Sequence, residues 1–129
     1  PVVTHDPDLK RLFDSDIIIS ETTLAELKNR CPQVPTLEEV LQRYGGKLHL
    51  MVEAKEEHYP QPEKQNKILA NLFAQLQAKK DFHLLSLVPE MLVLLNFVGT
   101  SAKLLVAVFN AKNLSKISLT ENIIIATSF

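Results

Sequence analysis

The sequence predicts an α/β protein in which helices cover a parallel β-sheet. Several apolar runs are nearly continuous rather than alternating with polar residues, which is typical of strands that are buried on both faces. These runs alternate along the chain with segments whose apolar residues recur at helical spacing. At 129 residues the chain is long enough for one domain with a sizeable core, so we expect residues 1–129 to form one domain or part of one.

The first strand is expected at Val2–His5, where an apolar run ends in the pair His5-Asp6 and a proline follows. Such a strand would deliver two polar, titratable side chains at its carboxyl end. The next apolar run, Ile-Ile-Ile-Ser at 17–20, predicts either a short strand or a loop segment that covers the core.

Two short helices are expected in residues 20–46, because the same N-terminal signal occurs twice there. Either Thr22 or Thr23 can cap the first helix. Glu26 follows Thr23, and Glu39 follows Thr36, at the spacing of a capping box. The expected ends are residues 31–32 for the first helix and the glycine pair 45–46 for the second.

From residue 47 onward, the prediction alternates strands with helices. A helix is expected at about 63–80, where apolar residues between positions 68 and 76 share one helical face. The other expected elements are strands at 47–55, 82–87, 103–109 and 122–129 and a helix at 89–98.

Charge and composition exclude several classes of protein. The formal net charge of −1 provides no basic surface of the kind that nucleic acids require, so we expect no nucleic-acid partner. The most apolar stretch, residues 82–98, is interrupted by polar residues and a proline and falls short of ~20 apolar residues, so we expect no stable membrane insertion. No signal peptide is visible in the sequence as given, and we expect a soluble chain, with a cytoplasmic location favoured. The single cysteine, Cys31, excludes an internal disulfide and is interpreted as a small, partly buried hydrophobe.

Four polar residues end the two strands that are expected in the first half of the chain. His5 and Asp6 follow the first strand, and Glu53 and Lys55 end the strand at 47–55. Because carboxyl ends of parallel strands form the functional end of a sheet or barrel, these are candidate site residues. Glu53 could ligate a hard divalent cation, Lys55 could offset phosphate charge, and His5 could act as a general acid or base. Alternate strand residues share a face, so Glu53 and Lys55 should project together.

Each pair also has a simpler interpretation. A His-Asp pair is often the start of a loop, in which the aspartate caps a turn. A glutamate and a lysine two residues apart are often an exposed ion pair worth ~0–1 kcal/mol. His49 and His58 show no metal-ligand spacing and are interpreted as structural or surface residues, and His83, beside Phe82, is interpreted as part of a strand start.

Four successive blocks of residues 1–55 resemble segments of the glycerophosphodiester phosphodiesterase family. V-V-T-H-D-P-D-L-K-R at 2–11 resembles the family's V-V-x-H-D-x-x-L-x-R segment, and V-P-T-L-E-E-V-L at 34–41 is very close to its I-P-T-L-E-E-V-L segment. T-T-L-A-E-L-K-N-R at 22–30 resembles a helix of the family, and L-M-V-E-A-K at 50–55 is similar to its N-I-E-I-K strand. Order and spacing agree as well, and the resemblance is weaker after residue 60.

The resemblance implies a TIM barrel whose active site lies at the carboxyl ends of its strands. It implies that His5 is the second of two catalytic histidines, that Glu53 binds a divalent metal ion (Mg²⁺ or Ca²⁺), and that Lys55 lies near the phosphate. Asp6 belongs to the motif and is expected to support the site. A TIM barrel takes ~250 residues, so the chain should hold about half of one, strands three to six. The family's H-R-G, E-N-T and E-x-D motifs and its late W-T-V-N-like segment are not in this sequence.

The activity that the resemblance implies is metal-dependent hydrolysis of a small-molecule glycerophosphodiester to glycerol 3-phosphate and an alcohol, a reaction of lipid and glycerol metabolism. With half of the barrel, the 129-residue chain is expected to be catalytically incomplete by itself. Two alternatives stay open: a related phosphodiesterase acting on a lysophospholipid or sphingolipid, and a non-catalytic binding or scaffold domain that keeps the barrel. Half a barrel leaves sheet edges open, so we expect a partner or a further segment to cover them.

Overall fold

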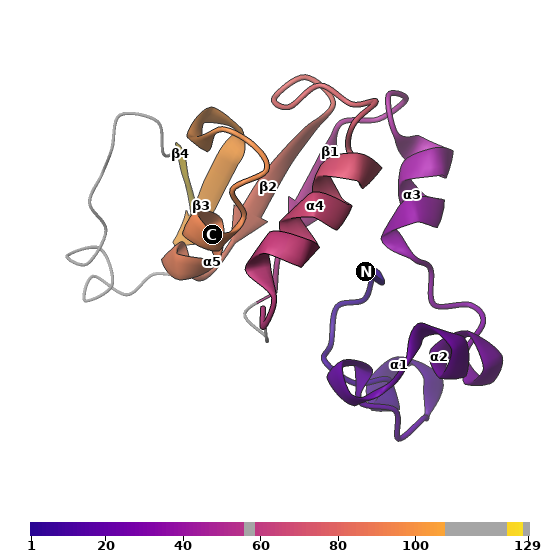
Figure 1. Ribbon diagram of the computed structural model, residues 1–129. Helices are drawn as coiled ribbons and strands as arrows, with labels where there is room; N and C mark the ends of the chain where they lie inside the picture. Colours follow the sequence, from indigo (N-terminus) through magenta and orange to yellow (C-terminus); the bar gives the residue numbers. More distant parts are fainter. Residues whose placement is uncertain (56–58, 108–123, 128–129) are drawn as a thin grey trace. The chain divides into compact units, whose positions relative to one another are not determined.

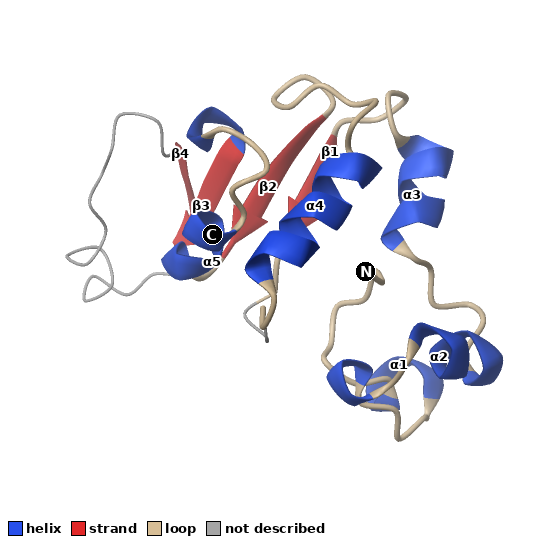
Figure 2. Cartoon of the chain, in the orientation of Figure 1, coloured by secondary structure: helices blue, strands red, loops and turns tan. Residues whose placement is uncertain are grey.

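The computed structural model of the chain describes residues 1–55, 59–107 and 124–127 (Figure 1). The chain divides into two compact units, Pro1–Arg43 and Tyr44–Phe129. Figure 2 shows that the first unit is built from short helices and loops, whereas the second contains all four strands of the described sheet.

The first unit has a small apolar core between short helical segments. These segments are α1 (Lys10–Phe13), the 3-10 helix η1 (Ile19–Glu21), α2 (Leu24–Arg30) and α3 (Leu37–Tyr44). The core side chains come from α2 and from the loops on either side of it, and they are Leu9, Ile17, Leu27, Cys31 and Val34. The burial of Cys31 confirms its interpretation as a small hydrophobe.

Both predicted capping boxes are present. At the start of α2, Glu26 N–H donates to Thr23 Oγ1 at 3.3 Å, and Thr23 N–H donates to Glu26 Oε2 at 3.0 Å. Reciprocal bonds of the same kind join Thr36 and Glu39 at α3, with distances of 3.1 and 2.7 Å. These bonds satisfy N–H groups that the first turn of a helix leaves unpaired. Beyond α3, Gly46 has a φ of 70°, the left-handed conformation with which glycine commonly ends a helix.

The predicted strand at Val2–His5 is wrong for the described residues. Val2 forms only an isolated antiparallel bridge with Thr36, and Val3 N–H donates to the Pro35 carbonyl at 2.8 Å. The segment therefore pairs with the residues just before α3. Pro35 has no N–H to donate, so this pairing cannot extend into a longer ladder.

Residues 17–20 follow the loop interpretation rather than the strand interpretation. Ile18 forms an isolated bridge with Asp8, and η1 begins at the next residue. Ile17 is only 2% exposed and belongs to the core of the first unit. The apolar run thus covers the core without entering a sheet.

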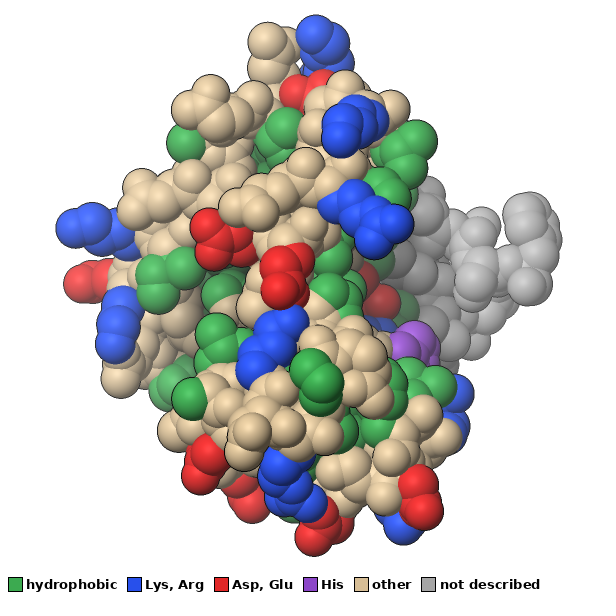
Figure 3. Space-filling model, turned by 90° about the vertical axis from the view of Figure 1, so that its right-hand side faces the viewer, with side chains coloured by type: hydrophobic (Ala, Val, Ile, Leu, Met, Phe, Trp, Pro, Cys, Tyr) green, Lys and Arg blue, Asp and Glu red, His purple; other side chains and the backbone are tan. Residues whose placement is uncertain are grey.

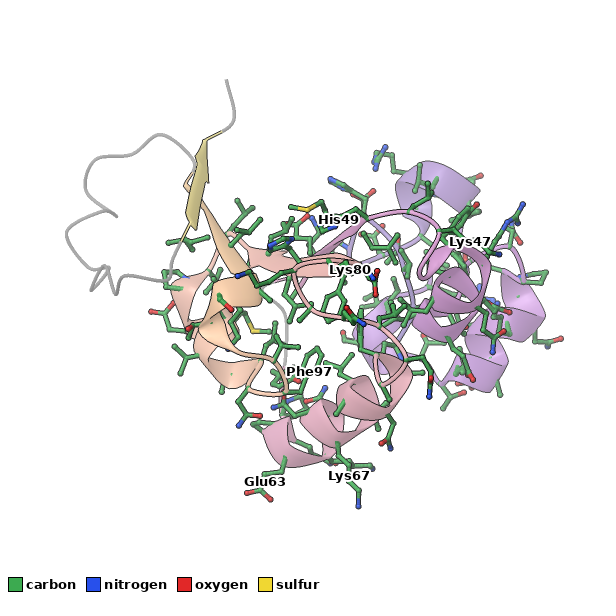
Figure 4. All side chains as sticks on the ribbon, turned by 90° about the horizontal axis from the view of Figure 1, so that it is seen from above. Lys47, His49, Glu63, Lys67, Lys80 and Phe97 are labelled. Carbon is green, nitrogen blue, oxygen red and sulfur yellow. The ribbon has the colours of Figure 1, made fainter. Side chains whose placement is uncertain are left out.

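The second unit contains a four-stranded sheet whose neighbouring strands are all parallel. Its elements are β1 (Leu50–Glu53), α4 (Pro62–Leu72), β2 (Phe82–Ser86), α5 (Pro89–Leu94), the 3-10 helix η2 (Thr100–Ala102), β3 (Lys103–Ala107) and β4 (Ile124–Thr127). The strand order is β1-β2-β3-β4. In Figures 1 and 4, α4 and α5 lie on the same side of this sheet. The predicted alternation of strands and helices and the parallel pairing are confirmed. The prediction that both faces of the sheet are covered is not met within the described residues, where Met51 of β1 is 52% exposed.

Helix α4 ends at Leu72, earlier than the predicted end near residue 80. Past this point the chain forms a turn in which Asp81 N–H donates to the Gln77 carbonyl at 2.8 Å, and the Asp81 carboxylate accepts from Gln77 N–H at 2.7 Å. Lys79 within this turn has a φ of 73°, which no right-handed helix accommodates. The helical spacing of apolar residues continues to Leu76, but these turn contacts direct the chain into β2 instead.

One face of the sheet packs against the helices. Phe82, Leu84 and Ser86 of β2 point to this face and are all buried. The ring of Phe73, which directly follows α4, lies with its centroid 4.4 Å from that of Phe82. This contact places the apolar core of the second unit between the sheet and the two helices.

The opposite face of the sheet is more exposed and carries the polar residues of interest. In β2 it carries His83 and Leu85, which alternate with the buried residues. Their partners in the parallel register of β1 are Met51 and Glu53. We call the face that bears these four residues the open face.

The described strands form an open sheet rather than a closed barrel. Within the described ranges, β1 pairs with β2 alone and β4 with β3 alone, so both are edge strands there. A parallel sheet with helices on one side is consistent with part of a TIM barrel, in which the other side faces the barrel interior.

The helices of the described ranges are short. The longest, α4, has 11 residues, and a helix needs ~20 apolar residues to span a bilayer. None of the helices in residues 1–55, 59–107 and 124–127 is therefore able to cross a membrane.

Candidate functional site

The carboxyl ends of β1 and β2 are joined by hydrogen bonds around Ala54. Ala54 N–H donates to the Leu85 carbonyl at 2.8 Å, which extends the ladder one residue beyond β1. Ser86 Oγ donates to the Ala54 carbonyl at 2.9 Å and accepts from Val88 N–H at 3.1 Å. Ser86 is completely buried. Ala54 is thus held through both of its backbone groups, and it lies between the two predicted site residues of this strand.

Glu53 and Lys55 form an ion pair at this end of the open face. Lys55 Nζ donates to Glu53 Oε2 at 2.9 Å. The distance confirms the prediction that the two side chains project together. The Glu53 side chain is 31% exposed and that of Lys55 is 40% exposed. Since solvent reaches both groups, their attraction is worth only ~0–1 kcal/mol, and either group can exchange it for another partner.

In the first unit, His5 and Asp6 form a hydrogen-bonded chain with Arg11. His5 Nδ1 lies 2.7 Å from Asp6 Oδ1, and Arg11 Nε donates to Asp6 Oδ2 at 2.7 Å. The hydrogen bonds from Arg11 and then from His5 lower the pKa of Asp6 from 3.8 to about 2. The same contact raises the pKa of Arg11. The carboxylate is therefore ionised at neutral pH and accepts from both neighbours.

The contact with Asp6 determines which nitrogen of His5 can take up a proton. An ionised carboxylate only accepts hydrogen bonds, so Nδ1 of His5 carries a hydrogen. In the neutral ring Nε2 is then the free acceptor. The His5 side chain is 74% exposed, so this nitrogen is accessible to a bound molecule. An oriented imidazole with one free nitrogen is suited to general acid or base catalysis.

Arg11, on α1, was not predicted as a site residue. The available signal was its place as the last residue of the 2–11 block that carries the family resemblance. The alternative in which Asp6 caps a turn does not describe its carboxylate, which contacts two side chains instead. A backbone contact of that kind belongs to Asp8, whose carboxylate accepts from Lys10 N–H at 2.9 Å.

Glu53 is the predicted metal ligand, but the described residues near its carboxylate do not supply the other ligands that a metal ion needs. One carboxylate oxygen is already in contact with the Lys55 ammonium. Among the residues that the structure describes, no group of three or more His, Cys, Asp or Glu side chains is placed to hold a metal ion. Ca²⁺ and Mg²⁺ take about six or more oxygen ligands. The described residues alone therefore do not fit a divalent cation, and Glu53 has the chemistry for one ligand of a larger set.

The predicted site residues fall into two pairs. His5 and Asp6 are in contact in the first unit, and Glu53 and Lys55 are in contact in the second. That the two pairs act in one site stays a prediction.

The second unit also contains an apolar cavity of about 290 Å³ near the end of α4. None of the predicted site residues lines it, and its lining has no titratable side chain. The lining residues are Ala70, Phe73, Ala74, Leu76, Ala78, Phe82, Phe97, Val98 and Gly99. The cavity therefore offers no charged side chain for phosphate or metal binding.

Charged side chains of both signs are interspersed on the face drawn in Figure 3. Elsewhere in the first unit, Lys28 Nζ forms an ion pair with Glu39 Oε2 at 2.7 Å. The hydrogen bond from Lys28, together with the capping contacts of Thr36, lowers the pKa of Glu39 from 4.5 to about 2. This ion pair links α2 to the start of α3.

Comparison with known families identifies one match that extends over almost the whole chain. The model of the glycerophosphoryl diester phosphodiesterase family matches residues 1–126. This range includes the four blocks at 1–55 and also the sheet of the second unit, where the resemblance by motifs is weaker. A comparison with curated proteins gives no match.

Proposed function

The chain belongs to the glycerophosphoryl diester phosphodiesterase family, and on this premise we propose that it serves in the hydrolysis of glycerophosphodiesters to glycerol 3-phosphate and an alcohol. We further propose that residues 1–129 form part of one phosphodiesterase domain. The match over residues 1–126 and the parallel α/β sheet both support this proposal. A sheet of this kind agrees with the TIM-barrel fold of the family.

The observation that carries the proposal is the chain of contacts from Arg11 through Asp6 to His5. Arg11 holds one oxygen of the Asp6 carboxylate, and the other oxygen holds His5 at Nδ1. The ring is thereby oriented with Nε2 free and accessible. A side-chain contact on each oxygen of the Asp6 carboxylate holds the ring in one orientation, and a proton-transfer residue benefits from a fixed ring.

Hydrolysis of a phosphodiester requires two proton transfers. A water oxygen attacks phosphorus and loses a proton, while the bond from phosphorus to the alcohol oxygen breaks and that oxygen gains a proton. We assign one of these transfers to Nε2 of His5, with Asp6 holding the opposite nitrogen. The second transfer needs another group, which the resemblance implies to be a second histidine.

Lys55 and Glu53 are assigned to the charge of the phosphodiester. The Lys55 ammonium can leave Glu53 and neutralise a phosphate oxygen, because the ion pair is partly exposed and weak. The Glu53 carboxylate would supply one oxygen ligand to a divalent cation, Mg²⁺ or Ca²⁺. When bound, such a cation polarises the phosphodiester and stabilises the charge that develops on it.

The proposal is tested by an activity assay on the full-length protein. Glycerol 3-phosphate release is measured with glycerophosphocholine and glycerophosphoethanolamine, with added Mg²⁺, with added Ca²⁺, and with a chelator. We expect release that depends on one of the two cations and that the chelator abolishes.

Two other outcomes would contradict the proposal. Hydrolysis of a lysophospholipid or a sphingolipid, without release from either glycerophosphodiester, would assign the chain to a related lipid phosphodiesterase. A folded full-length protein with no metal-dependent activity on any of these substrates would make it a binding or scaffold domain.

A further inference from the structure

Two histidines meet at the amino ends of β1 and β2, at the end of the strands opposite to Glu53. His49 directly precedes β1, and His83 is the second residue of β2. His83 is the register partner of Met51, and His49 lies two residues before Met51, so both histidines belong to the open face. Figure 4 shows His49 beside Lys80, which precedes β2.

The hydrogen bonds of His49 determine where the hydrogens of both rings lie. His49 Nδ1 is 2.8 Å from the Lys80 carbonyl oxygen, and His49 Nε2 is 2.9 Å from His83 Nδ1. A carbonyl oxygen only accepts, so His49 Nδ1 carries a hydrogen and Nε2 of the neutral ring is an acceptor. His83 Nδ1 must then donate to it. Both neutral rings are therefore in the Nδ1–H form, and His83 Nε2 carries no hydrogen.

The positions of the two rings favour a hydrogen bond over a shared metal ion. The ring centroids are 5.0 Å apart, and the two bonded nitrogens are 2.9 Å apart. The difference between these distances is nearly the diameter of one imidazole ring. The nitrogens thus lie close to the line that joins the ring centres, and each faces the other. A metal ion bound by both would need the two lone pairs to converge on a point away from this line.

The surroundings of the pair oppose the uptake of protons. Burial, the neighbouring His49 and the ammonium of Lys79 lower the pKa of His83 from its usual 6.5. In the sequence, Lys47 precedes His49 and Lys80 precedes His83, and both are basic residues. The charged groups of the neighbouring elements have other partners: Asp81 accepts from Gln77 N–H, Glu53 accepts from Lys55, and Lys103 of β3 donates to the Leu92 carbonyl.

We propose that the His49–His83 pair is a proton-sensitive latch between the amino ends of β1 and β2. One proton added at His83 Nε2 leaves the latch intact, because His83 Nδ1 still donates to His49. A second proton must go to His49 Nε2, which then faces the N–H of His83. Two donors and two positive charges meet, and the bond between the strands is lost.

The direction of the pH effect depends on whether the folded or the unfolded chain binds protons more readily. Since folding lowers the pKa of His83 from 6.5, the unfolded chain takes up a proton at this histidine more readily than the folded chain does. Once the bond between the rings is broken, each ring can take up a proton, whereas the bonded pair takes up only one; a fall in pH below the unfolded value of about 6.5 therefore favours the broken bond. The latch is thus closed at neutral pH and opens in acid.

The first test reads the hydrogens of the two rings directly. Nitrogen-15 NMR of the full-length protein at pH 8 should show both His49 and His83 as Nδ1–H tautomers. An Nε2–H tautomer at either residue would overturn the proposal. This measurement uses the wild-type protein and so does not depend on a variant that folds.

The second test follows hydrogen exchange at Leu50, whose N–H donates to the Asp81 carbonyl at 2.8 Å between the two segments. After correction for intrinsic exchange, its protection should fall by about fivefold from pH 8 to pH 5, as expected for the loss of one hydrogen bond. The His83→Phe variant, which keeps an aromatic ring without Nδ1, should lack this pH dependence. Lys67→Gln, at an exposed lysine of α4, leaves both histidines and their charged neighbours in place and should retain it. Equal pH dependence in wild type and His83→Phe would overturn the proposal.

Discussion

Lys55 donates a hydrogen bond to the carboxylate of Glu53 at 2.9 Å, across the single residue Ala54, whose carbonyl is held by the buried hydroxyl of Ser86. The two charged groups are thereby presented together at the carboxyl end of β1. Their backbone is held in place, while the side chains themselves remain partly exposed. This combination of a fixed backbone with exchangeable side chains underlies the first two predictions.

Replacing Lys55 by methionine should weaken catalysis of phosphodiester hydrolysis. A charge-assisted hydrogen bond to phosphate is worth ~1.5–3 kcal/mol, so we expect kcat/KM to fall by about 10- to 100-fold. Lys67→Met is the matched control, because Lys67 is an exposed lysine on α4 that points away from the sheet (Figure 4). Equal kcat/KM values for the two variants would show that Lys55 does not contact the phosphodiester.

Replacing Ser86 by alanine should destabilise the end of the sheet. The substitution leaves the Ala54 carbonyl and Val88 N–H without their buried partner, which costs ~1–3 kcal/mol. Urea unfolding of the full-length protein measures this loss. Ser101→Ala, at an exposed position in η2, is the control and should change the free energy of unfolding by less than ~0.5 kcal/mol. A Ser86→Ala protein as stable as the control would show that the hydrogen bonds of Ser86 contribute nothing to the free energy of unfolding.

The contacts of Asp6 should make stability sensitive to strong acid. Its pKa is about 2 in the folded chain against an ordinary value of 3.8, so the folded state holds the ionised form more firmly than the unfolded state does. The contribution of the Asp6 contacts is therefore complete above pH 3.8 and is lost as the pH falls toward 2. The free energy of unfolding of wild type and Asp6→Asn should differ by a constant amount above pH 4, and the difference should shrink below it. A difference that stays constant down to pH 2 would contradict the Arg11–Asp6–His5 chain.

The two described glycines with different backbone conformations should respond in opposite ways to alanine. Gly46 has a φ of 70°, so Gly46→Ala should cost about 1–2 kcal/mol. Gly99 has a φ of −68°, and a Cβ there meets no atom within 4 Å, so Gly99→Ala should stabilise by ~0.4–1 kcal/mol through the unfolded state. Thermal unfolding of the two variants measures both. The same sign of effect in both would contradict the backbone described for the end of α3 or the start of η2.

Local signals in the sequence predicted much of this fold. The capping boxes at Thr23 and Thr36 depend on residues three positions apart, so they are readable without knowledge of distant contacts. The strands from Leu50 onward were recognisable because their apolar runs are nearly continuous. The predicted strand at Val2–His5 failed because its partner, Thr36, lies more than thirty residues away and cannot be inferred from the run itself.

The candidate site was predictable only in part, for the same physical reason. The Glu53–Lys55 contact follows from the alternation of side chains along one strand. The contact of Arg11 with Asp6 depends on a turn that brings α1 back to the start of the chain. The bond between His49 and His83 joins residues 34 positions apart and depends on the register of β1 with β2. Neither of these two contacts has a spacing that a sequence pattern would reveal.

The central claim is that His5 transfers a proton in phosphodiester hydrolysis and that Glu53 contributes a ligand to the divalent cation that the reaction needs. The variants His5→Ala and Glu53→Ala should therefore fail in different ways. Loss of a general acid or base lowers turnover by roughly 10²–10⁴ and leaves metal affinity largely intact. Loss of a carboxylate ligand weakens metal affinity, so activity should return in part at high metal concentration. Glu63→Ala, at an exposed glutamate in the first turn of α4 (Figure 4), is the control and should behave as wild type.

The most direct measurement is the release of glycerol 3-phosphate from glycerophosphocholine by the full-length protein and these variants across a metal titration. The account predicts that His5→Ala has a much lower maximum rate with an unchanged metal midpoint, and that Glu53→Ala has a midpoint shifted to higher metal concentration. Near-wild-type rates in His5→Ala, or an unchanged midpoint in Glu53→Ala, would contradict it.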